Sequence, residues 1–208
     1  MDTDLIRPLP KDNPVSQKLG LADKYIAMYS GTISISSNRA LERVLEAARL
    51  LREDKTMKIA IVGEGLKKKS LEDKAASLGL DNVVFVPFQP YEELPALLSS
   101  ADVLLVPLDI EKSQLSVPSK LYNFMAAGRP ILGLADSTSE VASIIANTGC
   151  GLCVPPDDPH RIAKALLTLK GSPYDAKSMA NQGRRYAEQH FSKKEILKRY
   201  EELLASLY

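Results

Sequence analysis

The run Ser-Val-Pro-Ser-Lys-Leu-Tyr-Asn-Phe-Met-Ala-Ala-Gly-Arg-Pro-Ile, residues 116–131, carries the strongest structural signal in this chain. It follows an apolar run at residues 103–107 through a polar loop. Serine and proline near its start and Gly128 near its end are typical of helix termini. The first N–H groups of a helix lack partners within the helix and lie at the positive end of its dipole. The run therefore predicts a helix that follows a strand and offers a site for an anion.

Lys120 and Asn123 lie three residues apart near the start of this predicted helix, so they share one side of it. A cation and an amide at that end suit a diphosphate and a neighbouring sugar hydroxyl. Leu121 and Met125 place apolar side chains on another face, which would pack on a sheet. The run thus combines an anion-binding end with a buried face.

These residues resemble the donor-binding signature of the retaining glycosyltransferases of family 4 (group 1), which have the two-domain GT-B fold. The signature reads Pro-x-Lys-Leu-x-Glu-x-Met-Ala-x-Gly-x-Pro. Its positions are filled here by Pro118, Lys120, Leu121, Asn123, Met125, Ala126, Gly128 and Pro130. Asn123 stands where the family usually has the glutamate that binds the ribose, and an amide supplies no charge, so the resemblance implies a weaker hold on the ribose. The run Ser-Val-Pro-Ser-Lys-Leu-Tyr is especially similar to that of bacterial enzymes of colanic acid and O-antigen synthesis.

Length and composition describe one ordinary globular domain. The chain has 208 residues, of which 45% are apolar and 25% are charged. With 27 Lys and Arg against 26 Asp and Glu, the net charge of +1 gives no broad attraction to nucleic acid. No apolar run approaches the roughly 20 residues of a membrane span, and no signal peptide is visible. We therefore predict a soluble, cytoplasmic chain without a nucleic-acid partner.

The two cysteines, Cys150 and Cys153, form a Cys-Gly-Leu-Cys run. Redox pairs and metal pairs share this spacing, but zinc would need two further ligands, and the chain has only His160 and His190 as histidines. A thioredoxin-like pair opens a helix, whereas this pair belongs to an apolar run at residues 151–154 that meets two prolines. We predict two reduced structural cysteines and no metal site.

Short apolar runs that alternate with helical patterns predict the fold. They occupy residues 25–30, 58–62, 83–86 and 103–107, a segment from residue 131, and residues 151–154. We predict an α/β fold, a Rossmann-like parallel sheet of about six strands with helices on both faces. Ligands of such sheets bind at the carboxyl ends of the strands. Gly31, Gly63, Pro87 and Pro118 each follow a strand, so four loops converge on one edge and favour a single nucleotide site.

The resemblance assigns roles to two of these loops. Thr32 and Ser37 stand where the family places two cations on the donor phosphates, and hydroxyls supply hydrogen bonds without charge. From the residues alone, a solvated serine-rich loop ahead of a helix that begins at Asn38 is an equal interpretation. Gly63 and Glu64 resemble the family's second donor loop.

A third loop resembles the turn that packs against the nucleotide base in this family. It contains Pro87 and Phe88 and is followed by Glu93, Leu94 and Pro95. The resemblance implies contact with the base through backbone and apolar groups. For the Phe85 and Phe88 rings, the residues themselves favour core positions.

The resemblance also implies that Lys120, with the N–H groups of its helix, stabilises the charge that develops on the leaving diphosphate. The implied donor-binding residues are Gly31, Thr32, Ser37, Gly63, Glu64, Pro87, Phe88, Pro118, Ser119 and Asn123. The loop at residues 108–115 would lie over the donor, where Glu111 is the nearest substitute for the family's sugar-contacting glutamate. Asp2-Thr3-Asp4 has the form of a metal-binding motif, but no strand precedes it, so we interpret it as part of the hinge. The resemblance implies neither an essential metal nor a cofactor.

We predict three segments: a hinge-like lead-in at residues 1–23, a donor-binding domain at residues 24–190, and a C-terminal helix at residues 191–208. The resemblance implies that the chain is the C-terminal half of a longer enzyme. The other half would bind a glycan or lipid-linked acceptor, and the whole enzyme would be free to associate with the inner face of the membrane. The apolar stripe of the last helix would reach toward that half, and its exposure here would favour self-association.

The implied function is transfer of a sugar from a nucleotide diphosphate sugar to an acceptor in surface polysaccharide or lipopolysaccharide synthesis. This chain alone is expected to bind the donor without turnover. Two alternatives stay open. A sugar-nucleotide epimerase of the same architecture would need acid–base carboxylates or histidine in the cleft. A non-catalytic nucleotide-binding or partner-interaction module is suggested by Thr32, Ser37 and Asn123.

Overall fold

The computed structural model describes residues 1–108 and 117–206. The loop that was expected to lie over the donor, with Glu111, therefore falls outside the described residues except for Leu108.

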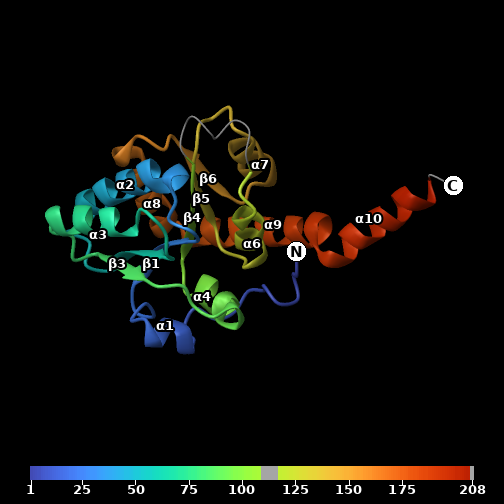
Figure 1. The fold of residues 1–208 in the computed structure, drawn as a ribbon, viewed down its shortest axis with the longest axis horizontal. Coiled ribbons are helices and arrows are strands. Elements are labelled where there is room, and N and C mark those ends of the chain that lie inside the picture. Colours follow the sequence, from blue (N-terminus) through green and yellow to red (C-terminus); the bar gives the residue numbers. More distant parts are fainter. Residues whose placement is uncertain (109–116, 207–208) are drawn as a thin grey trace.

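Six parallel strands form one sheet in the order β3-β2-β1-β4-β5-β6 (Figure 1). Their bounds are Tyr25–Ser30 for β1, Met57–Val62 for β2, Val83–Val86 for β3, Val103–Pro107 for β4, Ile131–Leu134 for β5 and Gly151–Val154 for β6. The predicted Rossmann-like sheet is thereby confirmed. The strand order reverses between β1 and β4, and the crevice at such a reversal is where sheets of this type bind ligands.

One face of the sheet is covered by α2 (Ile35–Leu50), α3 (Lys68–Ser77) and α8 (Pro159–Gly171). The apolar stripe of α2, including Leu41, Val44 and Leu45, is fully buried against residues of β1, β2, β4 and β5. Burial of apolar surface on this scale is the main favourable contribution to folding.

The opposite face is covered by α1 (Pro14–Lys18), α4 (Leu94–Ser99), α6 (Lys120–Ala126), α7 (Glu140–Thr148) and α9 (Pro173–Phe191). A short 3-10 helix, η1 (Tyr91–Glu93), leads into α4. Leu121 and Met125 of α6 are fully buried on this side, as their spacing predicted. Helices therefore cover both faces, and α6 is anchored between the sheet and α9.

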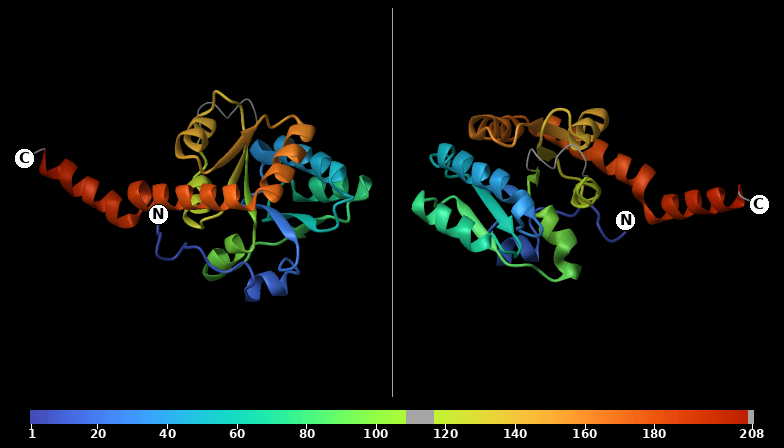
Figure 2. Two further views of the ribbon diagram at one scale, coloured as in Figure 1. Left: turned by 180° about the vertical axis from the view of Figure 1, so that it is seen from behind. Right: turned by 45° about the horizontal axis from the view of Figure 1, so that its top comes forward.

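The last helix, α10 (Lys193–Ala205), extends away from the body of the protein (Figures 1 and 2). Its predicted apolar stripe is exposed at Leu197, Tyr200, Leu203 and Leu204. Reach toward another half and self-association both remain predictions for this stripe. Across residues 1–108 and 117–206, no helix combines the length and apolar character that crossing a membrane requires.

The lead-in is not simply extended. It contains α1, and its Ile6, Val15 and Leu21 side chains are buried in the core on the side of the sheet that α6 covers. The Arg184 side chain in α9 donates hydrogen bonds to the carbonyl oxygens of Thr3 and Ile6. The lead-in is thus packed on the domain along much of its length.

The serine-rich segment after β1 differs from the sequence prediction. Helix α2 begins at Ile35, one turn before the predicted Asn38. Ser34 is the N-cap, and it forms a reciprocal capping box with Ser37. Ser37 is consequently a buried helical residue rather than part of a solvated loop.

Both cysteines are free thiols, with Cys150 buried and Cys153 partly buried. Burial raises the pKa of Cys150 and raises that of Cys153 to about 11. Neither thiol is activated, which agrees with the structural role predicted for the pair.

Candidate functional site

A cavity of about 410 Å³ opens at the carboxyl ends of β1 and β2, beside the start of α6 and next to the point where the strand order reverses. The end of β1 contributes Ser30, Gly31 and Thr32, and the start of α6 contributes residues from Ser119 to Phe124. Phe88, Gln89 and residues of η1 and α4 complete the wall. The cavity therefore lies in the crevice that the fold predicts for a ligand.

Lys120 supplies the one cation that lines this cavity among the described residues. Its Nζ atom lies 3.0 Å from the hydroxyl oxygen of Tyr29 and 4.2 Å from the centre of the Tyr29 ring. Burial lowers the pKa of Lys120 to about 8. No carboxylate in the described part of the chain is paired with this ammonium group, so its charge is free to meet an anion.

Helix α6 begins at Lys120, close to where the sequence predicted it, but the geometry of its start is less open than expected. Ser119 does not cap the helix with its side chain, and the N–H of Leu121 donates to the carbonyl of Pro118. Gly128, with φ of 63°, follows the helix as predicted. The helix has only seven residues, so the Lys120 side chain is the main attraction for an anion here.

The loops after β1 and β2 pack against each other. The N–H of Gly31 donates to the carbonyl of Val62, and the N–H of Ile33 donates to the carbonyl of Glu64. A Cβ atom on Gly31 would lie 2.6 Å from Nζ of Lys120. Glycine at residue 31 therefore leaves the space through which the lysine reaches Tyr29.

Six of the predicted site residues lie together in the wall of the cavity: Gly31, Thr32, Phe88, Ser119, Lys120 and Asn123. Five others lie outside that wall: Ser37, Gly63, Glu64, Pro87 and Pro118. Glu64 forms an exposed ion pair with Lys68 at 2.7 Å. Gly63 serves loop packing, because a Cβ atom there would meet the backbone of Gly31.

Phe88 does not occupy the core position that the sequence favoured. Its side chain is 52% exposed and lines the cavity, whereas Phe85 packs on the core as expected. Sequence reasoning missed Tyr29, Gln89 and Tyr91. The signal for Gln89 and Tyr91 was their place in the same turn as Phe88, and that for Tyr29 was its position two residues before Gly31.

The described wall of the cavity contains neither a carboxylate nor an imidazole. Chemistry that needs an acid–base pair therefore finds no such group among these residues. What the wall offers is one ammonium, several hydroxyl and amide groups, and the apolar surfaces of Phe88, Tyr91 and α4. This combination suits a ligand with an anionic part and a flat apolar part.

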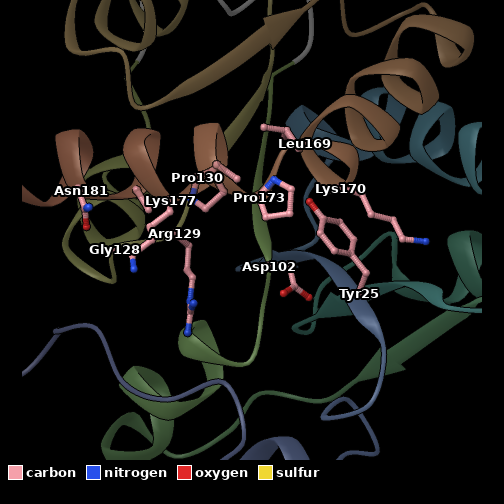
Figure 3. Close-up of a pocket in the computed structure, with 12 residues that line it drawn as sticks. Tyr25, Asp102, Gly128, Arg129, Pro130, Leu169, Lys170, Pro173, Lys177 and Asn181 are labelled. Atoms are coloured by element: carbon pink, nitrogen blue, oxygen red, sulfur yellow. The ribbon is translucent and has the colours of Figure 1, made fainter.

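A second cavity, of about 470 Å³, lies at the amino ends of the strands, on the opposite side of the sheet from the first cavity (Figure 3). Tyr25, Asp102 and Arg129, which stand at or before the amino ends of strands, contribute to it together with residues of α8 and α9. Asp102 already pairs with Lys11, and Arg129 donates to the carbonyls of Leu9 and Ser99. Although this cavity is larger, its Asp102 and Arg129 side chains already bind the lead-in, so we place the candidate site at the carboxyl ends of the strands.

Comparison with known proteins shows the family of this chain. The family described as Glycosyl transferases group 1 matches residues 13–186. The chain belongs to the group 1 glycosyltransferases. It is 35% identical over 189 residues to the putative colanic acid biosynthesis glycosyl transferase WcaI of Escherichia coli K12. The match covers 88% of this chain and 44% of that relative, so this group 1 chain spans less than half of the relative's length.

Solved structures share the fold of this group 1 chain. The crystal structure of HepE from Anabaena in complex with UDP has a TM-score of 0.82 at 18% identity, over 99% of this chain and 56% of that one. The C-terminal domain of the group 1 protein LpcC from Francisella tularensis has a TM-score of 0.72 at 19% identity, over 93% of this chain and 99% of that one. The described fold thus matches that of the LpcC C-terminal domain over nearly the whole of that domain.

Proposed function

We propose that this chain is the donor-binding domain of a retaining glycosyltransferase that acts in surface polysaccharide synthesis. The observation that supports this most directly is the Lys120 ammonium, unpaired with any described carboxylate, in the cavity at the strand-order reversal. The similarity to WcaI, whose name assigns it to colanic acid biosynthesis, supports the polysaccharide context. The UDP complex of HepE supports a nucleotide diphosphate sugar as the donor.

Different residues of the cavity bind different parts of the donor. Lys120 contacts the diphosphate and stabilises the negative charge that the leaving group gains as the glycosidic bond breaks. Asn123, one turn further along α6, hydrogen-bonds the ribose. Phe88 and Tyr91, both more than half exposed, offer ring faces to the base. Catalysis of this kind depends on positioning and electrostatics, without an acid–base residue from the described wall of the cavity.

We further propose that the acceptor binds to a domain beyond this chain, and that this chain alone binds the donor without transferring the sugar. The support is the length of the relatives, since the chain covers 44% of WcaI and 56% of HepE. In the same proposal, the exposed apolar stripe of α10 faces that further domain.

Calorimetric titration of this chain with UDP, GDP and ADP tests the donor site. We expect one of the three to bind at micromolar to millimolar strength, and Lys120→Met to weaken it at least tenfold. Lys177→Met is the matched control, because Lys177 is an exposed lysine that lines the second cavity. Failure of all three nucleotides to bind, or equal weakening by both variants, would contradict the proposed site.

A further inference from the structure

Tyr29 lies near the carboxyl end of β1 and is 0% exposed, with its ring in the core of the α2 face. Its hydroxyl oxygen lies 2.6 Å from the carbonyl oxygen of Thr32 and 3.0 Å from Nζ of Lys120. A carbonyl only accepts hydrogen bonds and an ammonium only donates them. The directions are therefore fixed: Lys120 donates to Tyr29, and Tyr29 donates its single proton to Thr32.

Three features hold the Lys120 ammonium in this position. It lies over the face of the Tyr29 ring, where a cation is attracted by the ring's negative face. It donates to the Tyr29 hydroxyl. It passes through the space left by Gly31, where a Cβ atom would approach within 2.6 Å. One tyrosine thus fixes the lysine and, through the Thr32 carbonyl, the loop that forms the neighbouring wall of the cavity.

A phenol has a specific advantage over a carboxylate at this place. A carboxylate would neutralise Lys120 and would have to be displaced before a diphosphate could pair with the ammonium. Burial raises the pKa of Tyr29, so its hydroxyl stays neutral. The phenol therefore orients the ammonium while leaving its charge available.

We propose that Tyr29 is a positioning residue. It holds the Lys120 ammonium in place to pair with the donor diphosphate, and it holds the Thr32 carbonyl and thereby the neighbouring wall of the cavity. This inference rests on the proposed function, because it names a further residue of the same site. It makes a statement about the ligand-free chain as well, which can be tested independently of any nucleotide.

The test is Tyr29→Phe, which keeps the ring and removes the hydroxyl. Isotope-edited NMR of the lysine side chains, with Lys120 assigned through Lys120→Arg, gives the pKa of Lys120 without ligand. Loss of an accepting hydroxyl removes a bond that favours the charged form, so we expect this pKa to fall by about half a unit to one unit. Nucleotide affinity near neutral pH should fall about 3- to 10-fold, the range expected for the net contribution of one typical hydrogen bond.

Tyr25→Phe is the matched control, since Tyr25 begins the same strand and its buried hydroxyl has no hydrogen-bond partner among the described residues. It should change neither the pKa of Lys120 nor the affinity. Lys120→Met provides a reciprocal measurement in a chain that keeps Tyr29. In that variant the NMR signals of the Tyr29 ring should move while those of Tyr25 stay in place.

The outcomes separate this inference from the proposed function. A Lys120 pKa that is equal in wild type and Tyr29→Phe overturns the inference, whatever the nucleotides do. A shifted pKa with unchanged nucleotide affinity also overturns it, because positioning would then be irrelevant to the donor. If the Lys120 pKa differs between wild type and Tyr29→Phe but the wild-type chain binds no nucleotide, the hold of Tyr29 on Lys120 is supported. The donor-site function is then overturned instead.

Discussion

A Cβ atom on Gly63 would lie 2.0 Å from the carbonyl oxygen of Gly31, although the two glycines follow different strands. Gly65 makes a similar approach, because a Cβ atom there would lie 2.3 Å from the carbonyl oxygen of Ile33. The loops after β1 and β2 therefore touch backbone to backbone. The loop after β1 carries Gly31 and Thr32, which line the cavity. The loop after β2 supports that wall from behind, although its Gly63 and Glu64 do not line the cavity.

Gly63→Ala should destabilise the chain by more than about 2 kcal/mol, because it combines a backbone clash with a φ of 143° that other residues rarely adopt. Urea denaturation measures the change. Gly171→Ala is the control, since Gly171 ends α8 in open space and its φ is not positive. That control should be neutral or slightly stabilising, and equal losses in the two variants would contradict the packing argument.

Nucleotide binding should weaken as the pH rises through about 8, where Lys120 loses its proton. One unit above this pKa only about a tenth of the lysine is charged, so affinity should fall roughly tenfold. Lys120→Arg keeps its charge at that pH, so its affinity should stay level. Calorimetry at matched pH values compares the two chains and cancels the ionisation of the nucleotide. Parallel pH profiles for wild type and variant would show that Lys120 does not carry the dependence.

The strands could be predicted closely because each is a short apolar run bounded by turn residues. The start of α2 could not, since Ser34 and Ser37 read equally well as a loop until the capping box shows that they close a helix turn. Core positions are similarly ambiguous at the ends of strands. Phe85 and Phe88 are three residues apart, yet Phe85 is partly buried against the core and Phe88 lines the cavity.

The candidate site was predicted through Lys120 and Asn123, because their spacing on one helix is a local property. Tyr29 was not, since its contact with Lys120 joins residues that are 91 positions apart. An apolar strand pattern reports that a tyrosine ring is buried but says nothing about where its hydroxyl ends. To predict a contact between residues on neighbouring strands and their loops, the order of the strands must be known, and the sequence alone did not provide it.

Arg184 should contribute to stability by joining three parts of the chain. Its guanidinium donates to the carbonyls of Thr3 and Ile6 in the lead-in and, at 2.8 Å, to the carbonyl of Ala126 at the end of α6. Arg184→Lys keeps the charge but cannot reach all three acceptors, so we expect a loss of about 1 to 3 kcal/mol in urea denaturation. Arg185→Lys, an exposed neighbour, should have no effect.

The Arg184 variant should also loosen the lead-in before the domain unfolds. Limited proteolysis followed by mass spectrometry should detect earlier cleavage within residues 1–23 in Arg184→Lys than in Arg185→Lys. Identical cleavage in both variants would mean that the buried Ile6, Val15 and Leu21 hold the lead-in without help from the arginine.

Lys120→Met should stabilise the chain at neutral pH while it weakens nucleotide binding. Folding lowers the pKa of Lys120 from 10.5 to about 8 because burial disfavours the ammonium. Below the folded pKa both states hold the proton, and the folded state bears the full cost of the buried charge. Between the two values only the unfolded chain keeps it, so the contribution of Lys120 to stability rises with pH over this interval. The variant lacks this cost at every pH.

The gain in Lys120→Met should therefore be on the order of 1 to 3 kcal/mol below the folded pKa and should shrink toward zero as the pH approaches the unfolded value. Urea denaturation of both chains at matched pH isolates the effect, since every other titrating group is shared. Lys177→Met should show no such dependence, because its side chain is exposed in both states. A variant less stable than wild type at neutral pH would mean that the contacts of Lys120 with Tyr29 outweigh the burial of its charge, and that the site is not held at the expense of stability.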